Sequence, residues 1–166
     1  MEEQITYTPI GVIHTPWSPQ DGAPYQPVEV GDASREFRVE VFPQYESALE
    51  GLEAFRFIYL LYHLNCAEDS FQLIVSPPWT DGLEVGLFAS RSPARPNPIG
   101  LSIVRLLERQ DNLLYTSGLD VFDGTPLLDI KPYIQELDAK SNSNFGWLED
   151  LPDKEHLLLH IKGIPH

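Results

Sequence analysis

The chain has 166 residues, of which 42% are hydrophobic and 11% aromatic, and it carries a formal net charge of −14. This size predicts one domain with a sizeable core, and the negative charge argues against a general polyanion-binding surface. No apolar run approaches the roughly 20 residues of a membrane span, no signal-peptide pattern is present, and the single cysteine excludes an internal disulfide. We therefore expect a cytoplasmic protein without a membrane segment.

Two strands are predicted in the N-terminal third. Residues 5–15 are rich in β-branched side chains, and residues 36–43 alternate apolar with charged side chains. Alternation with a period of two is typical of an antiparallel sheet that has one solvated face. Apolar residues at helical spacing predict one or two helical turns over residues 45–55, where Gly51 disfavours a longer helix.

The rest of the chain continues in short apolar runs separated by turn residues. These runs cover residues 55–64, 71–76, 84–90, 99–109, 112–122 and 126–134. Many short strands at close spacing favour a mainly β fold, either a barrel or a sandwich, with short helical segments. A polar stretch at 137–144 then leads to a terminal piece that contains a short predicted helix at 154–160.

Residues 90–102, SRSPARPNPIGLS, combine three prolines with two arginines. Each proline fixes φ and removes a backbone donor, so the segment is predicted to be a stiff, extended loop. A rigid loop loses little entropy when a ligand docks, and Arg91 or Arg95 could then clamp a carboxylate through paired hydrogen bonds. A purely structural crossover between strands is an equally good interpretation.

Positive charge is concentrated in the same region. Residues 91–109 hold four arginines against Glu108 alone, whereas residues 1–90 hold three arginines against fourteen acidic side chains. An anionic partner is therefore expected to bind around residues 91–109. Solvated arginines, or arginines paired with nearby carboxylates, are the alternative.

A second polar cluster lies at residues 117–133. It places Asp120, Asp123, Asp129 and Lys131 within twelve residues, and the last two share one face of a predicted strand. A carboxylate near a cation can act as a general base or anchor a ligand, so Asp123, Asp120 and Lys131 are candidate catalytic residues. Because a glycine follows Asp123, this carboxylate is also well placed simply to cap a tight turn.

No metal site is predicted. His156 and His160 have the spacing of one helical face, but no third ligand accompanies them and the HExxH order is missing. Cys66 and His63 face opposite sides of a predicted strand, which argues against a nucleophilic dyad. The sequence also contains no P-loop and no GxGxxG fingerprint.

Taken together, the two clusters match a known signature. FASRSPARPNPIGLSIV followed by LDVFDGTPLLDIKPY resembles the TrmO family, also called TsaA-like or YaeB-like proteins, and PIGVIHTPW, YQP and GLEAF add to the likeness. The resemblance implies a compact antiparallel β-barrel that binds S-adenosylmethionine, commonly as a homodimer. It assigns residues 1–136 to the barrel and residues 137–166 to a tail packed on the same domain.

The resemblance also implies site residues. The family's cofactor contacts carry over onto Tyr25, Gln26, Pro27, Asn65, Cys66, Arg91, Leu101, Ser117, Gly118, Leu119 and Asp120. His63 lies two residues before Asn65 on the same strand face, so its ring is expected to substitute for the histidine that family members often carry in this region.

The implied activity is methylation of N6 of threonylcarbamoyl-adenosine beside the anticodon of transfer RNA. The RNA is expected to bind the local basic surface between Arg91 and Arg109, and a base such as Asp123 or Asp120 would help the weakly nucleophilic N6 to lose its proton. A sensor of S-adenosylmethionine, or a methyltransferase for a small molecule, is the alternative that the acidic composition favours.

Overall fold

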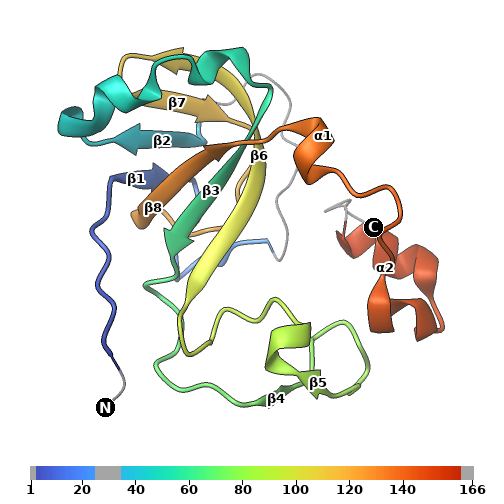
Figure 1. The fold of residues 1–166 in the computed structure, drawn as a ribbon. Coiled ribbons are helices and arrows are strands. Elements are labelled where there is room, and N and C mark those ends of the chain that lie inside the picture. The colour runs from blue at the N-terminus through green and yellow to red at the C-terminus, as the bar shows by residue number, and fades with distance from the viewer. Residues whose placement is uncertain (1–2, 25–34, 162–166) are drawn as a thin grey trace.

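The computed structural model describes residues 3–24 and 35–161, and its centre is a six-stranded antiparallel barrel (Figure 1). In order around the barrel the strands are β1 (Gly11–His14), β2 (Arg38–Val41), β7 (Leu113–Thr116), β6 (Ile99–Gln110), β3 (Phe57–His63) and β8 (Thr125–Pro132). Because β8 pairs with β1, the sheet has no free edge within the barrel. The prediction of a mainly β, antiparallel barrel is confirmed.

Alternation of side chains builds the core. In β2 and β3 every second residue is buried, and the same period continues through the first half of β6. The side chains that fill the barrel come from all six strands: Ile13, Val39, Val41, Ile58, Leu60, Val104, Leu114 and Leu127. Phe37, Leu119 and Val121 add to this core from the loops at one end of the barrel.

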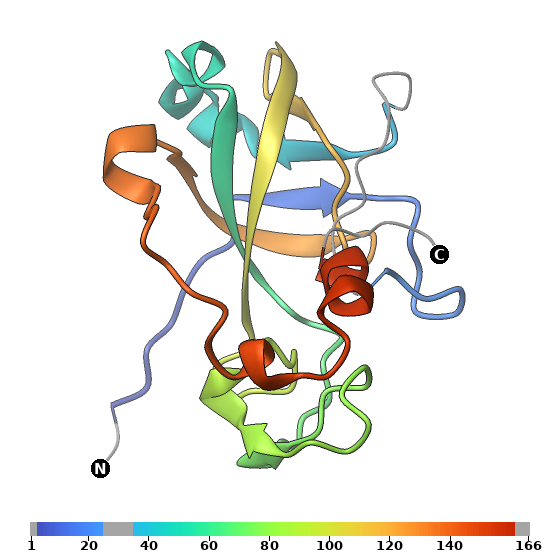
Figure 2. The same cartoon turned by 90° about the vertical axis from the view of Figure 1, so that its right-hand side faces the viewer.

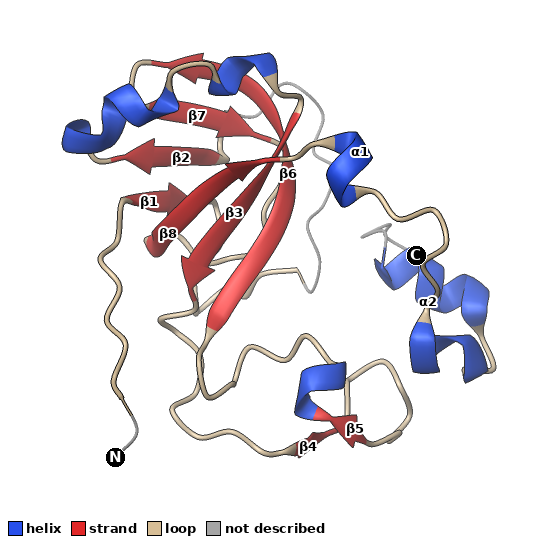
Figure 3. Cartoon of the chain, viewed as in Figure 1, coloured by secondary structure: helices blue, strands red, loops and turns tan. Residues whose placement is uncertain are grey.

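Short helices and a small lobe are attached to the barrel. The helical turns predicted over residues 45–55 are two 3-10 helices, Pro43–Leu49 and Leu52–Ala54. A separate hairpin of β4 (Ile74–Val75) and β5 (Val85–Gly86), followed by the 3-10 helix Leu87–Ala89, forms a lobe beyond the end of β3 and the start of β6 (Figure 3).

The C-terminal segment runs beside this lobe (Figure 2). It contains α1 (Gln135–Asp138), the 3-10 helix Gly146–Asp150 and α2 (Lys154–Ile161). The indole N–H of Trp147 donates a hydrogen bond of 2.9 Å to the backbone oxygen of Ala89, and Leu157 is buried. Within the described ranges, none of the helices has the length and apolar character needed to cross a bilayer.

Four predicted strands are shorter than expected. Of residues 71–76 and 84–90 only Ile74–Val75 and Val85–Gly86 form strands, and Leu87–Ala89 form a 3-10 helix instead. Of residues 5–15 only Gly11–His14 form a strand, and residues 3–9 are exposed. The run at 112–122 pairs only as far as Thr116, after which residues 117–124 form a loop that hydrogen-bonds to the segment following β1. These loop contacts replace the sheet ladder as partners for the backbone.

Candidate functional site at the barrel mouth

Most of the predicted site residues gather at one end of the barrel, which we call the barrel mouth. The strand register brings the end of β1 and the start of β8 together, because Ile13 lies opposite Thr125. The end of β3 is there too, since Tyr62 lies opposite Gly100 of β6 on one side and Leu127 on the other. The loop of residues 117–124 connects β7 to β8 at this end.

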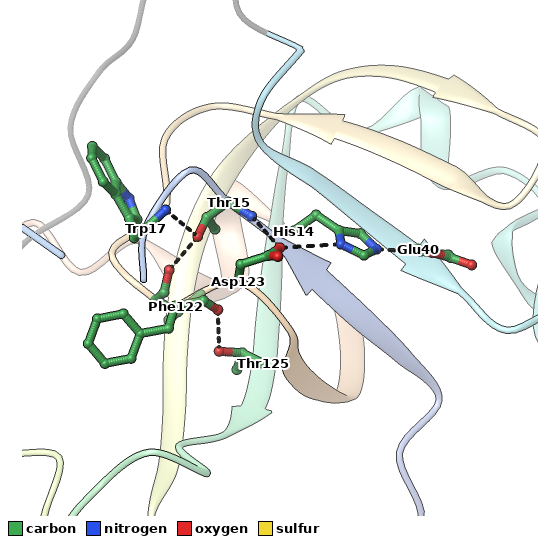
Figure 4. A network of polar contacts seen from close by, with 8 residues as sticks. His14, Thr15, Trp17, Glu40, Phe122, Asp123 and Thr125 are labelled. Atoms are coloured by element: carbon green, nitrogen blue, oxygen red, sulfur yellow. Dashed lines mark hydrogen bonds and ion pairs between the residues drawn. The ribbon is translucent and has the colours of Figure 1, made fainter. Parts of the chain in front are cut away.

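The loop 117–124 is held in place by the residues that follow β1. The Thr15 hydroxyl donates to the backbone oxygen of Val121 and the Trp17 indole N–H donates to that of Leu119, both at 2.7 Å. The backbone N–H of Asp123 donates in return to Trp17 at 2.8 Å. Figure 4 shows part of this network. The backbone is therefore held on both sides of Asp120.

Asp120 is the most perturbed acid of the mouth. Its Oδ1 atom is buried and has no hydrogen-bond partner among the described residues. Burial raises the pKa of Asp120 to about 6, while its own backbone N–H and the charge of Arg91 act in the opposite direction. A buried carboxylate oxygen without a partner is costly, so this atom is suited to accept a hydrogen bond or a positive charge from a ligand.

Tyr62 and Ser102 form a buried polar pair beside Asp120. The two hydroxyls lie 2.8 Å apart, and burial raises the pKa of Tyr62 to about 12, with Asp120 adding to the rise. The tyrosine ring lies against Gly100, where a Cβ atom would come within 2.0 Å of Cε2. Our sequence analysis missed this pair, although the alternation of β3 places position 62 on the inward face.

The last residue of β3, His63, and the turn that follows it lie at the same end of the molecule. His63, Asn65 and Cys66 are exposed, and the first two help to line a cavity of about 250 Å³ together with Arg95 and Pro98. A larger cavity of about 1000 Å³, between residues 78–83 and the C-terminal segment, contains none of the predicted site residues. The barrel mouth is the better candidate site because it holds the buried carboxyl group of Asp120, whose pKa is raised to about 6.

The remaining predicted cofactor residues differ in how exposed they are and in whether their polar atoms are already hydrogen-bonded. Leu101 points outward from β6 and is 56% exposed, whereas Leu119 is fully buried and its backbone oxygen already accepts from Trp17. Ser117 is half-buried, and its hydroxyl accepts from the backbone N–H of Arg105. Gly118 is buried. Tyr25, Gln26 and Pro27 lie outside the described residues.

Of the candidate catalytic residues, Asp120 and Asp123 share one loop, but Lys131 is not near them. Lys131 lies toward the far end of β8, opposite Tyr59, and its ammonium group pairs with Asp129 at 2.9 Å. The prediction that Asp129 and Lys131 share a face is therefore confirmed. Asp123 does lie beside a tight turn, as its alternative interpretation held, since Gly124 has a φ of 83°.

The arginines of residues 91–109 divide into two kinds. Arg95 donates to the backbone oxygens of Ser90 and Ser92 and lies over the ring of Phe88, so it holds its own loop together. Arg109 is bound to Leu49, Asp111 and Glu53. The guanidinium groups of Arg91 and Arg105 have no hydrogen-bond or ion-pair partner within the described ranges, which leaves these two side chains able to meet an anionic ligand.

The chemical groups at the barrel mouth suit the charged groups of S-adenosylmethionine. The exposed Arg91 guanidinium can bind a carboxylate in two-pronged fashion, and the unpartnered Asp120 oxygen suits a cationic or hydroxyl-bearing part of the ligand. In contrast, the part of the chain that the structure describes contains no group of three potential ligands able to hold a metal ion.

Comparisons with known proteins agree with S-adenosylmethionine as the ligand. A probable S-adenosyl-L-methionine-binding protein of Pyrococcus abyssi (strain GE5 / Orsay) is 46% identical over 87% of this chain and 77% of the relative. A human tRNA (adenine(37)-N6)-methyltransferase is 37% identical over 81% of this chain but only 31% of its own length. The crystal structure of TrmO from Pseudomonas aeruginosa matches with a TM-score of 0.68 at 33% identity, covering 87% of this chain and 63% of that one.

The present chain therefore spans less than two thirds of that TrmO chain and about a third of the human protein. Residues 12–139, most of the chain, match the model of the tRNA-methyltransferase O N-terminal domain. The chain belongs to the family of that domain, and the TrmO resemblance of its motifs is confirmed.

Proposed function

We propose that this protein is an S-adenosylmethionine-dependent methyltransferase that acts on N6 of an adenine in transfer RNA. The observation that carries the proposal is the barrel mouth, where a buried Asp120 oxygen, without a hydrogen-bond partner among the described residues, lies within electrostatic reach of the exposed Arg91. Relatives also support the proposal. One is named a tRNA (adenine(37)-N6)-methyltransferase, and others are named probable S-adenosyl-L-methionine-binding proteins.

The protein's part in the chemistry is chiefly placement. S-adenosylmethionine supplies an already activated methyl group, so the chain needs to bind the methyl donor, align the acceptor nitrogen and receive one proton. Arg91 and Asp120 are proposed to hold the donor, with His63, Asn65, Cys66, Leu101 and the loop 117–119 around it. Asp123, on the surface of the same loop, is proposed to receive the proton.

The specific nucleoside that we propose as the substrate is threonylcarbamoyl-adenosine beside the anticodon. The proposed site of action is the cytoplasm. The acceptor nitrogen of that nucleoside is part of a urea-like group and is a weak nucleophile, so a carboxylate base is useful at this site. Recognition would rest on the modified base entering the mouth, since only Arg91 and Arg105 of the expected basic surface are unengaged within the described ranges.

We propose that two copies of the chain form a homodimer through the outer face of β3 and β6. Five large apolar side chains are exposed on these two neighbouring strands: Phe57, Ile99, Leu101, Ile103 and Leu107. A contiguous apolar sheet face of this kind is unusual on a monomer and suits pairing with a second copy across a twofold axis. The face includes Leu101, so pairing there would bring the two mouths toward a shared interface.

The alternative function is a sensor of S-adenosylmethionine or a methyltransferase for a small molecule. It is favoured by the charge of −14 and by the internal pairing of Arg95, Arg109 and Lys131, which leaves little positive surface for RNA. Both functions share the same methyl-donor site, so they differ only in the acceptor.

One experiment separates these functions. Purified protein is titrated with S-adenosylmethionine by calorimetry and then incubated with labelled donor and transfer RNA from a strain that lacks this modification gene, followed by nucleoside analysis. Binding with label in N6-methylated threonylcarbamoyl-adenosine supports the proposal. Binding without label in any nucleoside favours the alternative, and absence of binding rejects both.

A further inference from the structure

His14 lies between two carboxylates at the barrel mouth. Its Nε2 atom is 3.0 Å from Oε2 of Glu40, and its Nδ1 atom is 3.3 Å from Oδ1 of Asp123 (Figure 4). The three residues come from the end of β1, from β2 and from the loop before β8. The Nε2 contact with Glu40 is a hydrogen bond, and the Nδ1 contact with Asp123 is an ion pair when the ring carries both of its protons.

The two oxygens of Asp123 have different surroundings. Oδ1 accepts from the backbone N–H of Thr15 at 3.2 Å and also contacts His14. Oδ2 has no hydrogen-bond or ion-pair partner within the described part of the chain, and 59% of the side chain is exposed. One oxygen is therefore anchored while the other faces outward, which is the arrangement that a surface proton acceptor needs.

We propose that His14 is a positioning residue for Asp123, which receives the proton released in methyl transfer through its Oδ2 atom. Glu40 in turn orients the imidazole ring from the other side. This inference rests on the proposed methyltransferase function and adds to it the identity of the base and of the residues that hold it.

The step balances without a further reactant. The bond between the methyl carbon and the sulfonium sulfur breaks, and the sulfur keeps its electron pair. The methyl carbon then bonds to the acceptor nitrogen. That nitrogen gives up its proton to Oδ2 of Asp123, and the neutral carboxyl group later releases the proton to water. The anchored Oδ1 atom and the imidazole ring do not change partners during the step.

The alternative is that the three residues merely tie the loop to β2. A structural tie and a positioning residue differ in how the loss of activity on removing His14 combines with the loss on removing Asp123. If His14 acts only through Asp123, removing it costs little once Asp123 is already disabled, whereas a structural defect adds to the loss. A double-mutant comparison therefore separates the two roles.

The experiment measures methyl-transfer kinetics, S-adenosylmethionine affinity by calorimetry and thermal stability. The variants are Asp123→Asn, His14→Ala, His14→Gln, His14→Arg, Glu40→Gln and the double variant of His14→Ala with Asp123→Asn. Glu53→Gln is the matched control, since it breaks a comparable carboxylate contact with Arg109. That contact lies toward the far end of β6, away from the mouth.

We expect Asp123→Asn to lower kcat about 100-fold and His14→Ala about 10-fold, with donor affinity within a factor of two of wild type. The double variant should be no slower than Asp123→Asn. His14→Arg, which can donate to both carboxylates, should recover more activity than the neutral His14→Gln. Nitrogen NMR of the His14 ring should report the loss of either carboxylate independently of turnover.

Each other outcome has a definite meaning. Normal kcat in His14→Ala or in Asp123→Asn overturns this inference while leaving the methyltransferase proposal intact. Additive losses in the double variant, or unchanged His14 ring signals in Glu40→Gln and Asp123→Asn, also overturn it. If wild-type protein binds the donor but methylates no RNA, the proposed function fails first and the inference fails with it. If His14→Ala does not fold, His14→Gln replaces it in the same comparison.

Discussion

The ring of Tyr62 occupies the space that a side chain at position 100 would need, since a Cβ atom on Gly100 would lie 2.0 Å from Cε2 of the ring. Gly100→Ala should therefore push the ring away from Ser102 and break their buried hydrogen bond. We expect a loss of about 1 to 3 kcal/mol in the free energy of unfolding, measured by denaturant titration. Gly86→Ala is the control, because nothing lies within 4 Å of its added carbon; equal losses in both variants would refute this account.

Stability should depend on the charge of Asp120. Its pKa is raised to about 6 in the folded protein, so the fold favours the neutral acid, and unfolding becomes easier as the pH rises from about 4 through 6. Asp120→Asn removes this penalty. The variant should be more stable than wild type at pH 7.5, by up to about 3 kcal/mol, and equal to it at pH 4. Melting curves at both pH values provide the measurement, and a difference that does not change with pH would contradict the prediction.

The methyl donor should depend on Arg91 for its binding. Arg91 has no ion-pair partner within the described ranges and lies at the edge of the mouth, where its guanidinium can bind a carboxylate through two hydrogen bonds. Arg91→Ala should weaken S-adenosylmethionine binding at least 10-fold in calorimetry. Arg91→Lys should recover only part of the affinity, because lysine keeps the charge without the planar fork. Unaltered binding by Arg91→Ala would exclude this role.

Assembly should depend on the outer face of β3 and β6. Ile103 is 50% exposed at the middle of that face, so Ile103→Asp would place a charge inside the proposed twofold interface. We expect wild-type protein to be a dimer at micromolar concentration and the variant to be a monomer, as measured by light scattering. Ile5→Asp, at a residue 72% exposed outside the barrel, is the control. A monomeric wild-type protein that binds the donor tightly would defeat the proposal.

Binding of RNA should depend only weakly on salt. Only Arg91 and Arg105 of the expected basic surface are unengaged within the described ranges, so few phosphates can be neutralised, and the slope of log affinity against log salt should not exceed about two. The measurement is titration of a threonylcarbamoylated anticodon stem-loop and its unmodified twin at several salt concentrations. The modified RNA should bind more tightly because its base enters the mouth. Equal, very weak binding of both would support the small-molecule alternative instead.

The fold was predictable from the sequence where one strand face is apolar and the other polar. Residues 36–43 show this clearly, and the structure forms β2 there with Val39 and Val41 inside. Residues 5–15 have the right composition for a strand along their whole length, but only residues 11–14 pair with β2 and only residues 11–13 pair with β8 as well. Composition reports what a residue prefers, whereas the length of a strand depends on its partners.

The site was predictable in part. The family motifs identified the loops of Arg91 and Asp120, and both lie at the barrel mouth. Lys131 is close to Asp123 in sequence, yet the six residue steps of β8 from Thr125 to Lys131 extend over about 20 Å. The contacts of His14 with Glu40 and Asp123 bring together three separate parts of the chain. No local pattern reveals such contacts, because they depend on how the barrel closes.

The hydrogen bonds from Thr15 and Trp17 to the loop 117–124 also bear on how the protein folds. They join residues 106 and 102 positions apart in sequence, and the pairing of β1 with β8 closes the barrel beside them. Contacts of such long range form slowly, because a large chain loop must be closed before they are gained. The barrel mouth should thus be among the last parts of the molecule to form, and a nascent chain should acquire it only after β8 has left the ribosome.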